Sequence, residues 1–222
     1  MITHIVFDFD GTLIDSMQIH TDKTAHLLRT QGIEMPEGLI NLLTPLGDKG
    51  AAVYLRDRFH LTISFSEMER IINDFALERY QNTIPSKPHA LDFVRRLHAQ
   101  GYPLYILSAS PHRLIDPCAE RLGFTPLFRD IFSCEDFGKV KTDPTLFTDL
   151  AARLGTTPEH IAFFDDNRIA IETATACGFY TVGVADPSSA KDEAVIRTTA
   201  NAFLDTFRDA ALGVLDPLGG DR

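Results

Sequence analysis

Hydrophobic residues follow two different patterns along the chain. Beyond residue 88, short continuous apolar runs, such as residues 104–107 and 161–164, alternate with stretches of helical spacing that end at glycines. Continuous apolar runs are typical of buried parallel strands, and the intervening helices supply the crossover connections. This part of the chain is therefore expected to form βαβ units, with a parallel sheet covered by helices on both faces.

The same pattern predicts where each element of this core lies. Strands are expected over residues 5–7, 104–107, 131–133, 161–164 and 181–184. Helices are expected over residues 89–100, 113–122 and 144–154, and from the end of the fourth strand to residue 177. Near the C-terminus, Phe203, Leu204 and Phe207 share one face of a helical turn. They predict a final helix that packs back on the core.

Residues 16–82 have helical character throughout. Ile71, Ile72 and Phe75, for example, follow the spacing of one helix face. Pro85-Ser86-Lys87-Pro88 ends the segment, because proline cannot continue a helix. The chain is therefore predicted to be an α/β protein. Its core comprises residues 1–15 and 83–222, and a small all-helical domain, residues 16–82, is inserted after the first strand.

Composition narrows the possible partners. Lys and Arg number 21 against 31 Asp and Glu, a formal net charge of −10. A surface this negative repels phosphate backbones and anionic lipids, which argues against nucleic-acid and membrane binding but not against a small anionic substrate. The 3 cysteines are far apart, and the first residues lack a signal-peptide pattern. Both features predict a cytoplasmic protein.

Polar residues stand where the predicted strands end. They are Asp8, Asp10, Ser108, Lys139 or Lys141, Asp165 and Asp166. In doubly wound sheets the carboxyl ends of the strands meet at one edge, where ligands bind. Several carboxylates at one edge repel each other, so a divalent cation is expected, and oxygen ligands favour Mg²⁺ over zinc. The predicted Mg²⁺ ligands are Asp8, Asp10, Asp165 and Asp166.

Such a set of side chains suits phosphoryl transfer. A metal ion and the lysine ammonium would neutralise the phosphoryl oxygens, and Ser108 would donate a hydroxyl, while one carboxylate attacks phosphorus. A second carboxylate, two residues further on, can protonate the leaving oxygen and then deprotonate water.

Four segments resemble the motifs of the haloacid dehalogenase superfamily. Phe7-Asp8-Phe9-Asp10-Gly11-Thr12-Leu13 is similar to the first motif, Asp-x-Asp-Gly-Thr/Val, of its phosphatase branches. The second, third and fourth motifs are matched by Leu107-Ser108-Ala109-Ser110, Lys141-Thr142-Asp143-Pro144-Thr145-Leu146-Phe147 and Phe163-Phe164-Asp165-Asp166. They come in family order, and the spacing of Lys, Pro and Phe selects Lys141 over Lys139. Thr142 and Thr145 depart from the usual Pro and Asp.

The resemblance implies a Rossmann-like three-layer core and a helical cap that closes over the site. It also implies a Mg²⁺-dependent phosphatase acting on a small phosphorylated metabolite of the phosphoglycolate or sugar phosphate class. Catalysis would proceed through an aspartyl-phosphate on Asp8, with Asp10, Ser108 and Lys141 as the other catalytic residues. Candidate substrate-binding residues are Thr12 and Ala109 in the motifs and His20, Lys49 and Arg79 in the cap.

Two other functions stay open at this stage. A phosphomutase of the β-phosphoglucomutase kind shares every core motif and often has a histidine at the position of His20. Against it, Lys49 stands where such mutases usually have an arginine, and Pro111-His112 replaces the usual Lys-Asn. A catalytically inactive binding or regulatory protein is disfavoured by the intact motif residues. The presence of Asp10 argues against a dehalogenase, which lacks the second aspartate.

Overall fold

The computed structural model describes residues 1–208, apart from the side chains of Thr44 and Asp48. The chain divides into two compact units. One contains Met1–Ser16 and the chain from Ile84 onward, and we call it the core; the other, Met17–Thr83, is the helical insert. Within residues 1–208, no helix is both long enough and apolar enough to cross a membrane.

The core is built on a parallel sheet of 6 strands in the order β3-β2-β1-β4-β5-β6. The strands are β1 (His4–Phe7), β2 (Leu104–Ser108), β3 (Asp130–Ser133), β4 (Ile161–Asp165), β5 (Tyr180–Val184) and β6 (Ala202–Leu204). The order reverses direction between β1 and β4, and in open α/β sheets ligands bind at such a point, outside the carboxyl ends of the strands. The α/β prediction with a Rossmann-like parallel sheet is confirmed.

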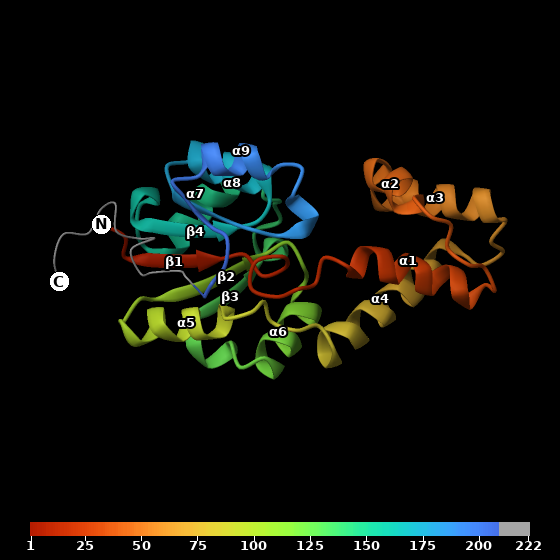
Figure 1. The fold of residues 1–222 in the computed structure, drawn as a ribbon, viewed down its shortest axis with the longest axis horizontal. Helices are drawn as coiled ribbons and strands as arrows, with labels where there is room; N and C mark the ends of the chain where they lie inside the picture. The colour runs from red at the N-terminus through yellow and green to blue at the C-terminus, as the bar shows by residue number, and fades with distance from the viewer. Residues whose placement is uncertain (209–222) are drawn as a thin grey trace. The chain divides into compact units, whose positions relative to one another are not determined.

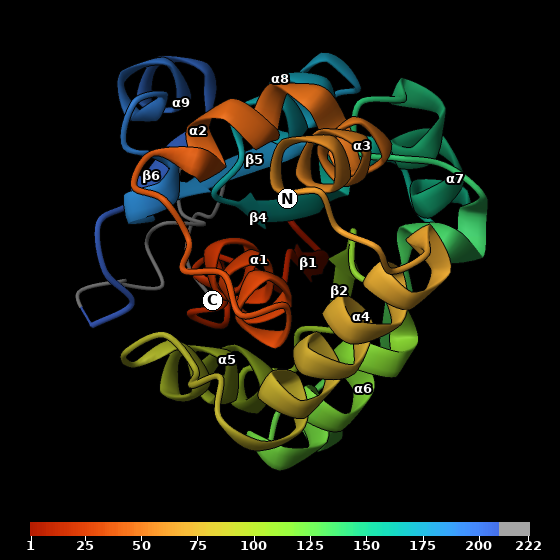
Figure 2. The same ribbon diagram turned by 90° about the vertical axis from the view of Figure 1, so that its right-hand side faces the viewer.

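Helices cover both faces of this sheet (Figure 1). On one face lie α5 (Ala90–Ala99) and α6 (His112–Arg121); on the other lie α7 (Pro144–Leu154), α8 (Arg168–Ala176) and α9 (Glu193–Thr199). Figure 2 shows the same division from the end of the core. Single turns of 3-10 helix connect several elements: η2 (Thr125–Leu127), η3 (Cys134–Phe137), η4 (Pro158–His160) and η5 (Pro187–Ser189).

The apolar strands are explained by this double covering. Val6 pairs in register with Phe163, and both belong to the cluster that contains Phe147 of α7. The next residue, Phe7, points to the opposite face, where its ring lies 6.3 Å from that of Phe93 in α5. Because successive strand residues face opposite sides, both must be apolar when both sides are covered.

The end of the described chain corrects one prediction. Residues 202–204 form the edge strand β6 and not a helix, and Val182 of β5 pairs with Ala202. A Cβ at Gly183 would lie 2.5 Å from Cγ2 of Ile196 and 2.7 Å from the ring of Phe203, so the glycine makes room for both side chains on the sheet. Tertiary pairing thus overrode a helical pattern that was only a few residues long. Leu204 and Phe207 are buried, so the expected packing against the core is confirmed.

The insert consists of helices, within the residues described, and has an apolar cluster of its own. Its elements are α1 (Ile19–Thr30), α2 (Leu39–Leu43), η1 (Thr44–Leu46), α3 (Gly47–Phe59) and α4 (Phe65–Asn82). Leu27, Leu55 and Met68, from α1, α3 and α4, are buried together. Ser64 caps α4 by accepting a hydrogen bond from the Glu67 main-chain N–H at 3.1 Å, which satisfies one of the free amides of the first turn.

Candidate active site

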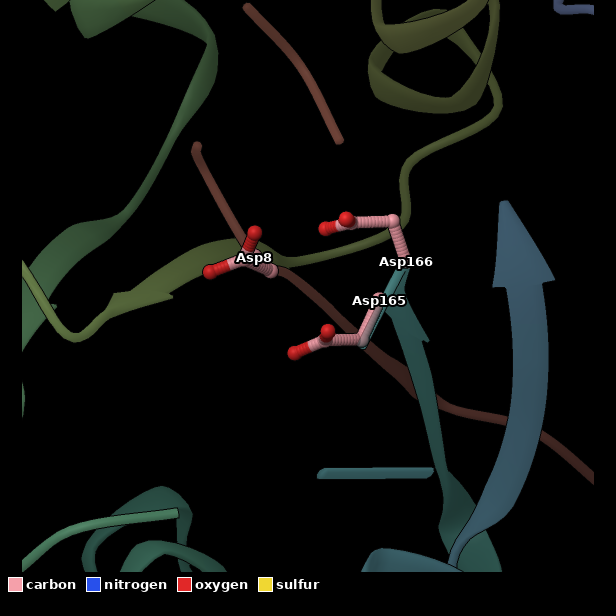
Figure 3. A group of neighbouring side chains, drawn as sticks. All are labelled: Asp8, Asp165 and Asp166. Carbon is pink, nitrogen blue, oxygen red and sulfur yellow. The ribbon is translucent and has the colours of Figure 1, made fainter. Parts of the chain in front are cut away.

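Three aspartates meet at the carboxyl ends of β1 and β4. Carboxylate oxygens of Asp8, Asp165 and Asp166 lie within 4.8 Å of one another, and all three residues are buried (Figure 3). We call them the three-aspartate group. The main-chain N–H of Asp8 donates to the Phe164 carbonyl at 2.8 Å, which continues the ladder between the two strands and fixes Asp8 beside Asp165. Sheet register therefore creates the group.

Lys141 is the cation that contacts this group. It lies in the loop before α7, and its ammonium donates hydrogen bonds to Oδ1 of Asp8 and, at 2.8 Å, to Oδ2 of Asp165. Lys139 instead pairs with Asp149 in α7. Of the two lysines that the sequence offered, the structure brings Lys141 into the site.

The charges of the group perturb one another. Burial would lower the pKa of Lys141, but the charges of Asp165 and Asp8 raise it well above its usual range. Burial also raises the pKa of Asp8 well above its usual value, with Lys141 opposing and the neighbouring carboxylates adding to the shift. For Asp166, burial and then the charge of Asp165 raise the pKa to about 7. One ammonium is thus too little positive charge for three buried carboxylates.

Asp166 is enclosed by two loops. The Ser189 hydroxyl donates to its Oδ2 at 2.8 Å, and the Thr12 hydroxyl lies 3.4 Å from its Oδ1. Gly11, in the loop after β1, has a φ of +81°, and a Cβ there would lie 2.8 Å from the Asp166 carboxylate. Glycine is therefore required at this position for two reasons: its positive φ, and the close approach of its Cα to the Asp166 carboxylate.

Asp10 has different surroundings. Its Oδ1 accepts a hydrogen bond from the Ser16 hydroxyl at 2.7 Å, and its Oδ2 accepts from the hydroxyls of Ser108 at 3.2 Å and Ser110 at 2.8 Å. We call these three residues the serine cluster. The Asp10 carboxylate is not part of the three-aspartate group, although the sequence analysis counted it among the metal ligands.

The serine cluster is itself held by the chain around it. The main-chain N–H of Ser110 donates to Ser108 Oγ at 3.0 Å, and the Ser133 hydroxyl at the end of β3 donates to the Ser110 carbonyl at 3.0 Å. Asp136 accepts a hydrogen bond from the Ser133 N–H at 2.9 Å and also contacts His112 at 2.9 Å. The loop after β2 is thus tied to the end of β3.

The predicted substrate-binding residues are distributed over both units. Thr12 is buried beside Asp166, and Ala109 is exposed in the loop between Ser108 and Ser110. His20 on α1 and Lys49 on α3 are exposed, and Arg79 on α4 lies 5.9 Å from the ring centroid of Phe75. These last three residues belong to the insert.

Sequence reasoning missed several residues that contact the site. Ser16, Ser110 and Ser189 each donate a hydrogen bond to one of the aspartates. Ser110 stands within the second motif-like segment, two residues after Ser108, so its position was a usable signal. Ser16 and Ser189 carry no signal in the sequence, because serine is common in loops and its role depends on what it contacts.

The donor set fits a metal ion. Three buried carboxylates offer oxygen atoms within 4.8 Å of one another, and one ammonium compensates only part of their charge. Hard divalent cations prefer oxygen ligands, and thiolate or imidazole ligands, which would favour softer ions, are not part of this group. The residues at the sheet edge can therefore hold a hard divalent cation.

Comparison with known proteins agrees with this site. Residues 2–178, which include every residue of the three-aspartate group, match the family described as haloacid dehalogenase-like hydrolase. The chain belongs to the haloacid dehalogenase-like hydrolase family. The predicted family is confirmed, and with it the assignment of the protein as a hydrolase.

Individual relatives of this hydrolase are phosphatases. A phosphoglycolate phosphatase from Salmonella paratyphi A is 28% identical over 96% of this chain and 93% of its own length. A probable pseudouridine-5'-phosphatase from Drosophila melanogaster is 25% identical, covering 96% and 94% of the two chains. The crystal structure of a putative β-phosphoglucomutase from Thermotoga maritima matches with a TM-score of 0.83 at 17% identity, over 98% of this chain and 100% of that one. This last likeness shows the fold.

Proposed function

We propose that the hydrolase is a Mg²⁺-dependent phosphatase that cleaves a small organic phosphate monoester through a phosphorylated Asp8. The observation that carries the proposal is the position of Asp8, which is buried at the carboxyl end of β1, bonded to Lys141, and within 4.8 Å of the carboxylate oxygens of Asp165 and Asp166. An anionic nucleophile can persist there only with cations beside it. The phosphatase relatives support the same reaction.

In this mechanism a carboxylate oxygen of Asp8 attacks phosphorus and the bond to the leaving oxygen breaks. Asp10 gives its proton to that oxygen, so the product leaves as an alcohol. Asp10 then takes a proton from the water that attacks the aspartyl-phosphate, which releases phosphate and restores Asp8. Lys141 and Ser108 would bind the phosphoryl oxygens. Mg²⁺, held by Asp8, Asp165 and Asp166, would supply charge compensation for the same oxygens.

Asp10 suits this double task because it stands apart from the metal ligands. A proton carrier has to exist in both protonation states during each turnover, and a metal-bound carboxylate is held in its ionised state. The serine cluster binds Asp10 through hydroxyls, which can rotate to accept as well as donate a hydrogen bond. The structure around Asp10 therefore tolerates a change of its charge.

The substrate is proposed to be a small phosphorylated metabolite of the phosphoglycolate or sugar phosphate class, and the name of one relative, phosphoglycolate phosphatase, supports the first of these. His20, Lys49 and Arg79 of the insert are the proposed selecting residues, and closure of the insert over the site would exclude bulk water. We further propose a cytoplasmic location, which the absence of disulfides among its cysteines supports.

A phosphomutase of the β-phosphoglucomutase kind is the second candidate. The Ser108-Ala109-Ser110 segment and His20 favour it, because both resemble that group. The core chemistry is the same, since Asp10 could activate a sugar hydroxyl in place of water. Lys49 argues for the phosphatase, because a single ammonium grips a second phosphate less directionally than the bidentate arginine of a mutase.

One assay separates the two functions. β-Glucose 1-phosphate is supplied with Mg²⁺ and a trace of the bisphosphate, and both glucose 6-phosphate and free phosphate are followed. A phosphatase releases phosphate from this and other small phosphates, and excess chelator abolishes the release. Isomerisation about a hundredfold faster than phosphate release, equivalent to 2.7 kcal/mol in barrier height, would establish the mutase instead.

A further inference from the structure

The segment after β5 reaches the three-aspartate group through one serine. Ser189, the last residue of η5, donates its hydroxyl to Oδ2 of Asp166 at 2.8 Å, across 23 positions of sequence. The Thr12 hydroxyl lies on the other oxygen, at a longer 3.4 Å. Ser189 is therefore the closer of the two hydroxyls that the described residues place on Asp166.

Asp186 shapes the turn that carries Ser189. Its Oδ1 accepts hydrogen bonds from the Ser188 N–H at 2.8 Å and the Ser188 hydroxyl at 2.6 Å, and its carbonyl accepts from the Ser189 N–H at 3.1 Å. The Asp186 side chain is only 2% exposed. A buried carboxylate requires a counterion, and the turn therefore depends on a partner for Asp186.

Lys87 is that partner, and it also joins this turn to the loop after β1. Its ammonium lies 2.7 Å from Asp186 Oδ2 and donates to the Ala185 carbonyl at 2.7 Å. Its main-chain N–H donates to the Leu13 carbonyl at 2.9 Å, directly behind the loop that carries Gly11. The two loops that enclose Asp166 are thus tied together by a lysine whose side chain is 11% exposed.

We propose that Ser189 is a positioning residue that sets the orientation of Asp166 for metal binding, and that the Lys87–Asp186 ion pair holds Ser189 in place. The proposal rests on the proposed metal site. Asp166 is repelled by Asp165, so without a fixed donor its carboxylate would turn away from the position that a shared cation needs. Hydrogen bonds to ligating carboxylates commonly strengthen metal binding in this way.

Metal affinity of the full chain tests the role of Ser189. Mn²⁺ serves as the probe, and the free ion is counted by electron paramagnetic resonance during titration. Ser189→Ala is expected to weaken Mn²⁺ binding by about tenfold, the lower end of effects at such positions. Ser189→Thr keeps the hydroxyl and should restore most of the affinity. Thr198→Ala, which removes a hydroxyl bonded to the Val195 carbonyl in α9, is the matched control and should bind as the wild type does.

The ion pair is tested by a double-mutant cycle. Lys87→Met is expected to weaken Mn²⁺ binding about as much as Ser189→Ala, and the double variant no further, because both act through the same contact. Asp186→Asn serves in place of Lys87→Met if the latter does not fold. Additive losses would show that Lys87 does not act through Ser189 and would overturn this part of the proposal.

The outcomes separate this inference from the proposed function. If the wild type binds Mn²⁺ and Ser189→Ala binds it equally well, the positioning role is wrong and the metal site stands. Equal melting temperatures of the two proteins in excess chelator show that the substitution leaves the fold intact. If the wild type binds neither Mn²⁺ nor Mg²⁺, the metal site fails and the positioning role fails with it.

Discussion

The two acidic parts of the site solve the problem of buried charge in different ways. The three-aspartate group places its carboxylates against one another and shares the ammonium of Lys141. Asp10, two residues from Asp8, is surrounded by the hydroxyls of Ser16, Ser108 and Ser110. The first arrangement leaves negative charge uncompensated, whereas the second satisfies each oxygen of one carboxylate with neutral donors.

This difference shows why neighbouring aspartates can have different tasks. Uncompensated negative charge attracts a metal ion, and the bound metal ion in turn attracts the anionic oxygens of the phosphoryl group. A neutral hydroxyl can donate a hydrogen bond to an ionised carboxylate or accept one from a protonated carboxyl group. This property suits a residue that transfers protons. The contrast predicts that substitutions in the two places differ in their response to metal and to the leaving group of the substrate.

The largest effect is expected for Asp8→Asn. The amide keeps the shape of the side chain but cannot attack phosphorus, so the rate of phosphate release should fall by at least about a thousandfold. Phosphate release from a small phosphate ester measures it, and circular dichroism checks that the fold is retained. Near-normal turnover of Asp8→Asn would assign the attack to another residue and remove the basis of the comparison.

Lys141→Met should reveal the excess charge of the three-aspartate group. Removing one partner from a buried set of charges costs about 3 kcal/mol of unfolding free energy. Because a divalent cation supplies the missing positive charge, Mg²⁺ should restore part of the loss. Urea denaturation of the wild type and of Lys141→Met, in chelator and in Mg²⁺, measures the loss of unfolding free energy and the part that Mg²⁺ restores. Identical losses in the two conditions would mean that Lys141 and the metal do not compensate the same carboxylates.

Ser110→Ala should affect proton transfer without affecting metal binding. The variant loses a 2.8 Å hydrogen bond to Asp10. We expect kcat/KM for an alkyl phosphate to fall by about tenfold, part of the roughly 10²–10⁴-fold that general acid–base catalysis contributes. For p-nitrophenyl phosphate, whose leaving group needs no proton, the fall should be smaller.

Ser110→Thr is the control for that experiment, since it keeps the hydroxyl. A comparison of kcat/KM for the two substrates in each variant gives the result, because this ratio reports the step in which the leaving group departs. If Ser110→Ala lowered kcat/KM equally for both substrates, the serine would not support proton transfer from Asp10 to the leaving group.

The smallest effect concerns pH and the support of the serine cluster. Hydrogen bonds that the His112 imidazole donates to Asp136 and then Asp116 raise the pKa of His112 above its ordinary value of 6.5. A raised pKa in the folded state means that the stabilisation is complete below about pH 6.5 and is lost as the pH rises through the folded pKa. Because His112 is partly exposed, the contribution should be below about 1 kcal/mol.

The measurement is the unfolding free energy of the wild type and of His112→Gln at pH 6 and pH 9. The difference between the two proteins should be larger at pH 6, where the wild type has the protonated imidazole between two carboxylates. An equal difference at both pH values would show that the histidine does not titrate against these carboxylates.

The sequence by itself determined most of the core and the place of three aspartates at the edge of its sheet. Buried parallel strands must be apolar on both faces, so the runs that became β1, β2, β4 and β5 were visible without any structure. Asp8, Asp165 and Asp166 were visible because they follow such strands, and all carboxyl ends of a parallel sheet meet at one edge. Local pattern and strand direction are enough for conclusions of this kind.

The tertiary structure alone decided what depends on partners distant in sequence. Residues 202–204 became a strand because β5 lies beside them, and the Asp10 carboxylate lies outside the three-aspartate group, where the hydroxyls of Ser16, Ser108 and Ser110 converge on it. Ser189 and Lys87 act through contacts with Asp166 and Asp186 that no local pattern encodes. A hydrogen bond forms only where donor and acceptor are within about 3 Å, and the fold brings these distant segments that close.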